Sequence, residues 1–112
     1  MKFILIPADV KLPIQVVEFE GNGYDKAREL VGGYIQLVQV QGYKKLDMCV
    51  DEDGKVFGKF FNIRATIVAA IAQDIVGDVV ITGKNFADVD KVAPYLIEQV
   101  NSERFHQEEK RK

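Results

Sequence analysis

Residues Ile75 to Gly83 read IVGDVVITG, and the apolar run inside this stretch decides the fold class. Residues 79–82 are all β-branched, which favours a strand over a helix. A short, continuous run of this kind is typical of a strand that is covered on both faces. We therefore predict a strand over Asp78–Thr82, at the centre of a sheet.

Further strands are predicted on the N-terminal side of this run. Phe3–Ala8 is a short apolar run, and Ile14–Glu20 contains alternating apolar and acidic residues, so these stretches predict the first two strands. Tyr34–Gln41 and Lys44–Asp51 predict the two arms of a hairpin that turns at Gly42. The apolar phase changes just after Leu37, which predicts a bulge or burial on both faces at this point.

A further short strand is predicted over Lys55–Phe57.

Two helices have recognisable ends. The first helix follows a cap at Asn22 or Gly23 and stops at Gly32-Gly33, where a left-handed conformation is easily reached. The second follows a cap at Asn62. Its apolar residues recur at helical spacing, which predicts one inward-facing stripe: Ile63, Ile67 and Ile71.

A last helix begins near Asp88, and a cap at Asp90 would leave Pro94 at the edge of its first turn. Strands and helices are mixed without a regular βαβ rhythm. The sequence therefore predicts an α+β fold: a single small domain over residues 1–104, with a largely antiparallel sheet and two or three helices. Residues 105–112 are charged and predict a frayed C-terminal tail.

Composition limits the kinds of partner. The net charge is -2, so the basic excess that drives nucleic-acid binding is missing. The longest apolar run, Ile67–Ala72, is far shorter than the about 20 residues that span a bilayer. The single cysteine cannot form an internal disulfide, which fits a reducing compartment. We expect a cytoplasmic protein that binds neither nucleic acid nor membrane.

Two loop motifs fail on inspection. Gly21-Asn22-Gly23 resembles the start of a dinucleotide-binding turn, but Lys26 stands where the third glycine is needed. Asp51-Glu52-Asp53-Gly54 resembles a calcium loop. Aligned on its glycine, the loop would need ligands at Cys49 and Phe60, and a phenylalanine cannot replace the bidentate glutamate. These stretches predict an ordinary turn before a helix and an acidic hairpin turn.

The sequence predicts no catalytic residue, metal site or cofactor. On the strand pattern, Cys49 shares a face with two aspartates, which disfavour the thiolate. His106 is the only histidine, so neither a histidine-centred triad nor a multi-histidine metal site can form within one chain. Chemistry by a pair of carboxylates stays open, because the spacing of the acidic residues singles out no pair.

One segment, Lys59–Thr66, combines two aromatic rings with basic and amide side chains ahead of a helix. Such a set can stack a nucleobase and hold an anion. The predicted ligand-binding residues are Lys59, Phe60, Asn62, Arg64, Thr66 and Asp78. The alternative is structural: Phe61 enters the core, Asn62 caps the helix, and Arg64 is solvated in either case.

Four stretches resemble an uncharacterised family of small proteins from phages, plasmids and bacterial genomes. They are Val31–Ile35, Asp51–Lys55, Gly58–Thr66 and Ile75–Gly83, and together they span roughly the first 90 residues in the family's order. The resemblance provides no catalytic residue. It implies an accessory role. Small phage proteins with such roles often act by binding other molecules.

Three hypotheses follow from the residues and the resemblance. The first is a non-catalytic, homo-oligomeric binding protein that sequesters a small anionic or nucleotide-derived signal in a counter-defence role. The second is an inhibitor that engages a host protein through a strand edge or an apolar patch. The third, which ranks last, is a small enzyme that uses Asp78 or another carboxylate.

Overall fold

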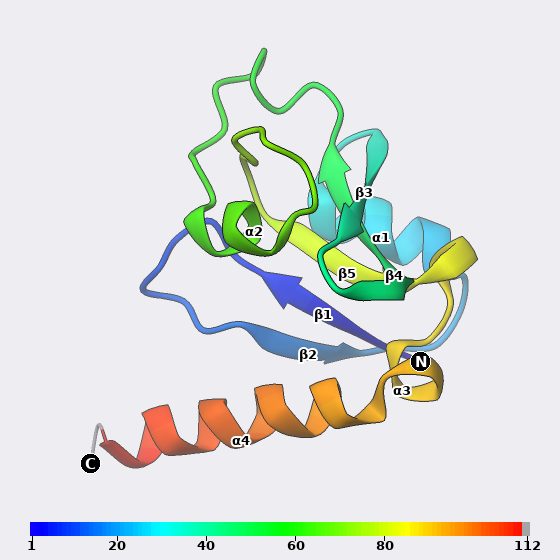
Figure 1. Ribbon diagram of the computed structural model, residues 1–112, viewed down its shortest axis with the longest axis vertical. Coiled ribbons are helices and arrows are strands. Elements are labelled where there is room, and N and C mark those ends of the chain that lie inside the picture. Colours follow the sequence, from blue (N-terminus) through cyan, green and yellow to red (C-terminus); the bar gives the residue numbers. More distant parts are fainter. Residues whose placement is uncertain (111–112) are drawn as a thin grey trace.

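The computed structural model describes the backbone of residues 1–110 and the side chains of residues 1–103. The tail expected over residues 105–112 lies outside the residues whose side chains are described, and it stays a prediction. The protein is built on one five-stranded sheet with four α-helices and a short 3-10 helix (Figure 1).

The sheet is antiparallel throughout, which confirms the predicted α+β class. Its strands follow the spatial order β2-β1-β5-β4-β3. The strand bounds are β1 Lys2–Ile6, β2 Gln15–Glu18, β3 Ile35–Val40, β4 Tyr43–Asp51 and β5 Val79–Gly83. The β-branched run at residues 79–82 thus lies in the central strand, and every residue of β5 is buried.

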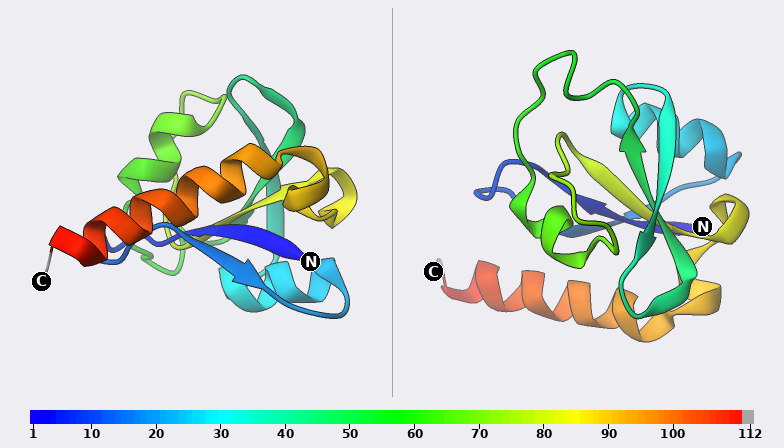
Figure 2. Two further views of the ribbon diagram at one scale, coloured as in Figure 1. Left: turned by 90° about the horizontal axis from the view of Figure 1, so that it is seen from below. Right: turned by 45° about the horizontal axis from the view of Figure 1, so that its top comes forward.

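Helices cover both faces of the sheet. α1 (Gly23–Val31) packs on one face, where its first residue lies against the ring of Phe3. α2 (Ile63–Val68) and α4 (Pro94–Lys110) lie on the other, on the side of Ile4 and Ile81. The two views in Figure 2 show α4 running along the β1–β2 side of the sheet.

The ends of α1 are those expected from sequence. The side chain of Asn22 accepts a hydrogen bond from the backbone N–H of Asp25. At the other end Gly32 adopts φ 78°, and its N–H donates to the carbonyl of Arg28. A residue with a Cβ is strained in this left-handed conformation, so glycine is the natural choice.

The hairpin of β3 and β4 differs from the prediction in the position of its bulge. The bulge falls between Gln39 and Val40, not near Leu37. In β4 both faces are buried from Leu46 to Asp51, because α1 covers the face that carries Cys49 and the 70–76 loop approaches the other. Two aspartates, Asp47 and Asp51, are therefore buried together with the apolar residues.

The chain between β4 and β5 makes a long excursion above one end of the sheet, drawn in green at the top of Figure 1. The short strand predicted over Lys55–Phe57 is wrong, because these residues form turns. The inward stripe of α2 is also wrong. Ile63 is 47% and Ile67 69% exposed, and Ala65 is the residue of α2 that is buried.

The C-terminal part contains two helices where the sequence predicted one. Asp88 caps the short helix α3 (Val89–Val92), so the predicted cap at Asp90 is wrong. Pro94 starts the next helix, α4, where its missing N–H would have had no helical partner in any case. The 3-10 helix η1 (Lys84–Phe86) connects β5 to this region.

Among the described residues, the helices are all too short or too polar to span a membrane.

Candidate functional site

Asn62 is fully buried and ties three segments together. Its Nδ2 donates to the carbonyls of Ile6 and Gly77, both at 2.9 Å. Its Oδ1 accepts the N–H of Ala65 at 3.0 Å, which caps α2. Two donors and one acceptor are thus engaged, so the amide holds the end of β1 and the approach to β5 against the start of α2.

Thr66 extends this network by one turn of helix. Its hydroxyl donates to the carbonyl of Asn62 at 2.8 Å and accepts the N–H of Ile75 at 2.9 Å. Beside it, Phe61 and Val76 form an isolated antiparallel bridge. The polar groups of Asn62 and Thr66 are therefore engaged with the protein's own backbone.

Arg64 and Asp78 hold one turn from two sides. The guanidinium donates to the carbonyls of Pro7 at 2.7 Å and Asp9 at 3.1 Å, and its Nε is buried without a partner. One carboxylate oxygen of Asp78 accepts the N–H of Ala8 at 2.9 Å. Arg64 was expected to be solvated, but its side chain is half-buried and its guanidinium is held by the carbonyls of Pro7 and Asp9.

Lys59 forms an ion pair with a buried carboxylate. Its Nζ lies 2.6 Å from Asp51 Oδ2 and donates to the carbonyl of Val31 at 2.9 Å, near the C-terminus of α1. The Asp51 side chain is 3% exposed, and its other oxygen accepts the N–H of Asp53. Burial alone would raise the pKa of Asp51, but the Lys59 ammonium and the Asp53 amide outweigh it and lower the pKa.

Three of the six predicted ligand residues line one hollow. Lys59, Phe60 and Asp78 surround an open space of about 330 Å³ whose walls also include Gly58 and Gly77. The ring of Phe60 is 85% exposed. Asp78 Oδ2 has no hydrogen-bond partner among the described residues, since Oδ1 makes the bond to Ala8. Asn62, Arg64 and Thr66 do not line this hollow.

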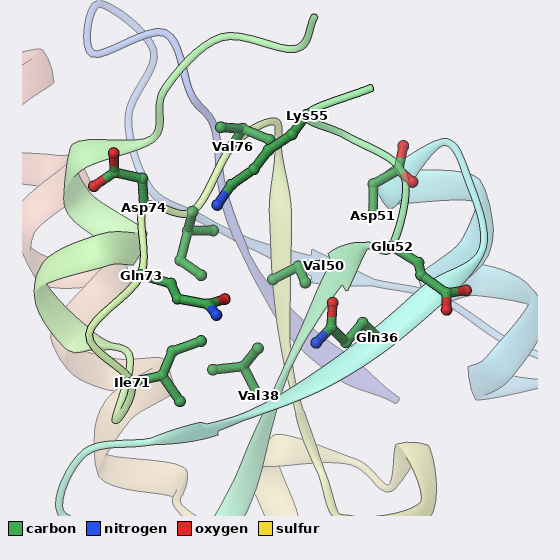
Figure 3. A pocket seen from close by; sticks show the side chains of 11 residues that line it. Gln36, Val38, Val50, Asp51, Glu52, Lys55, Ile71, Gln73, Asp74 and Val76 are labelled. Carbon is green, nitrogen blue, oxygen red and sulfur yellow. The ribbon is translucent and has the colours of Figure 1, made fainter. Parts of the chain in front are cut away.

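A second pocket is shown in Figure 3 and has a volume of about 130 Å³. It lies between the open end of the β3–β4 hairpin, where β3 begins and β4 ends, and the 70–76 loop. Gln36, Lys55 and Gln73 line it over a floor of aliphatic side chains. Sequence reasoning missed this pocket. One signal was present: Gln36 is polar but shares the inward phase of Val38 and Val40 along β3.

The lone thiol is shielded. Cys49 is fully buried, and burial raises the pKa of its thiol to about 11. The Asp47 carboxylate raises this pKa further, while a contact with the Thr82 hydroxyl lowers it. A thiol with so high a pKa is a poor nucleophile at neutral pH. The described residues contain no cluster of side chains suited to a metal ion, and the side chain of His106 lies outside them.

The family follows from comparison with known sequences. The model of a family described as a domain of unknown function, DUF3846, matches residues 1–106. The chain belongs to this family. Comparison with curated proteins and with solved structures gave no match. The description of DUF3846 names no activity.

Replacing Asn62 by alanine should destabilise the fold by about 2 to 4 kcal/mol, because two carbonyls and one N–H lose a buried partner. Chemical denaturation measures the loss. The matched control is Asn22→Ala, which removes an exposed cap and should cost about 1 kcal/mol. Equal losses in the two variants would contradict a joining role for Asn62.

The Asp51–Lys59 pair should make stability depend on pH. Because folding lowers the pKa of Asp51 from 3.8, the pair contributes fully above this value and is lost as the pH falls through the folded pKa. Asp51→Asn should therefore cost about 2 kcal/mol at neutral pH, and this difference from the parent should shrink in acid.

Urea unfolding at several pH values measures that difference. Glu29→Gln is the control, since it breaks only the exposed pair of Lys26 and Glu29 and should show a small, nearly constant effect. A difference for Asp51→Asn that grows as the pH falls would reverse the expected sign and refute the assignment.

Proposed function

We propose that this protein captures a small nucleotide-derived ligand without converting it, and that the hollow beside Phe60 holds the nucleobase. One observation carries the proposal. An almost fully exposed aromatic ring and a carboxylate oxygen without a partner among the described residues line the same hollow. A ring can stack on a base, and a carboxylate can accept the N–H groups of a base edge.

The walls of the hollow suit a flat ligand. Gly58 and Gly77 present backbone with no side chain, and both adopt positive φ. A Cβ at Gly77 would lie 2.8 Å from Cδ of Lys59, so a larger residue would push that side chain out of place. The open wall beside Phe60 therefore depends on glycine at this position.

The charges of the hollow favour recognition through the base more than through the phosphate. Among its described lining residues, Lys59 is the cation, and its ammonium is already paired with Asp51. Asp78 would repel a phosphate but attract the donor groups of a base. The anionic part of the ligand then points to solvent.

Capture without conversion is the simplest use of this lining. Asp78 and Lys59 are the charged side chains among its described lining residues, and each already makes a contact that holds the fold. In a phage or plasmid setting, capture would remove a host signal from solution, and such a counter-defence role would fit the accessory role that the resemblance implies.

The proposal is tested by titrating mononucleotides, cyclic nucleotides and dinucleotides and following heat of binding. Phe60→Ala and Asp78→Asn should each weaken binding about tenfold or more. The asparagine keeps an oxygen for the Ala8 N–H, so folding should be preserved. Phe57→Ala is the matched control, because this ring is 74% exposed but does not line the hollow.

Unchanged affinity in both variants would place the ligand elsewhere. A bound nucleotide should also be recovered intact after the protein is denatured. Recovery of an altered product would instead make the protein an enzyme.

A second candidate function is binding of a host protein, and exposed apolar side chains favour it. Residues 56–67 carry six large apolar side chains that are about half exposed or more, a segment we call the apolar surface: Val56, Phe57, Phe60, Phe61, Ile63 and Ile67. Exposed apolar groups concentrated in this way often mark protein contacts. The same surface would serve a homo-oligomer.

Phe57→Ser and Ile67→Ser should abolish capture of a host protein, because each replaces a large apolar side chain of the apolar surface by a small hydroxyl group. Nucleotide binding should be unaffected, since neither residue lines the hollow. Leu37→Ser is the control, an apolar residue of β3 that is 50% exposed and lies outside the apolar surface. Affinity capture and size-exclusion chromatography measure the outcome. Retention of the partner by both serine variants would count against this function.

A further inference from the structure

The pocket in Figure 3 has the dimensions of a small-molecule site. Its volume of about 130 Å³ is close to that of an engineered protein cavity that holds benzene. A ligand of six to eight non-hydrogen atoms, as a rough estimate, would fill it. It is lined by the turn after β4 on one side and by the 70–76 loop on the other, so a ligand would contact two chain segments.

Three polar side chains point into this pocket. Figure 3 shows the ammonium of Lys55 and the amides of Gln36 and Gln73 directed toward its centre. Within the described part of the chain, no carboxylate lies within ion-pair distance of Lys55. The side chain of Gln39, which lies on β3 like Gln36, forms hydrogen bonds with backbone carbonyls and with Lys84. The side chains of Gln36 and Gln73 form no hydrogen bond with a described residue.

The rest of the lining excludes a simple anion. The floor consists of aliphatic side chains, among them Val38, Val50 and Ile71. An apolar group of the ligand would cover them favourably, whereas a charged group placed there would lose its hydration. Glu52 and Asp74 also line the pocket, and Figure 3 shows their carboxylates pointing outward. With Asp51 neutralised by Lys59, these two acids outweigh the charge of Lys55, so a net anion would be repelled.

We propose that this pocket binds a free aliphatic amino acid. The carboxylate of the ligand pairs with Lys55, and its ammonium donates to the amide oxygens of Gln36 and Gln73. Its short side chain lies on the aliphatic floor. A zwitterion has no net charge, so the outward carboxylates do not oppose its entry. The site is separate from the hollow beside Phe60 and does not depend on the nucleotide proposal.

Titration with valine, followed by amide chemical shifts, tests the site. Saturable shifts should be confined to residues around 36–38, 50–55 and 71–76. Isovalerate, which lacks the ammonium, and isobutylamine, which lacks the carboxylate, should each bind at least about tenfold more weakly. Inorganic phosphate should produce no saturable shift in these residues.

Lys55→Met should weaken valine binding about tenfold or more, because it removes the charge and keeps the aliphatic stem. Lys45→Met, an exposed change on β4 outside the pocket, should leave the affinity unchanged. Both variants should bind nucleotide like the parent, so this inference and the proposed function can fail separately.

Three results would overturn the inference. One is the absence of saturable shifts at tens of millimolar valine. Another is a Lys55→Met variant with parental affinity. The last is isovalerate or phosphate binding as tightly as valine, which would show a general anion site.

Discussion

The buried amide of Asn62 is the contact on which the arrangement of this protein depends. The chain leaves the sheet after β4 and returns to it at β5, and both the return path and the end of β1 present carbonyls to the interior. A side chain at this point must donate twice and accept once. Aspartate would lack the donors, and glutamine would extend one methylene further. Without these bonds the carbonyls of Ile6 and Gly77 would be buried without a partner.

The excursion between β4 and β5 is held mainly by polar contacts. Its buried apolar residues are small or few, chiefly Ala65, Ala69 and Ile75. The Asp51–Lys59 pair secures its first turn to the end of α1, and Asn62 secures its middle. Because anchoring does not use the large apolar side chains, these can face outward and remain available for contacts with other molecules.

Local features were predictable, and contacts between distant segments were not. The cap at Asn22, the stop at Gly32 and the central strand depend on residues close in sequence, and all three were found. The helical spacing of Ile63 and Ile67 predicted an inward stripe, but α2 ends at Val68 and Ala65 is its buried residue. The role of Arg64 depends on carbonyls more than fifty positions away, which no local pattern encodes.

The two ligand sites proposed here share a wall. The backbone pairs across this wall, since the N–H of Gly77 donates to the carbonyl of Phe60 and the N–H of Asn62 to that of Ile75. Val76 lines the pocket of Lys55, and the next residue, Gly77, lines the hollow of Phe60. The Asn62 amide also holds the carbonyl of Gly77, so this wall is fixed to the sheet and cannot shift freely toward either site. Coupling between ligands requires an element with two arrangements, and a wall fixed in this way has one. We therefore expect the two sites to fill independently.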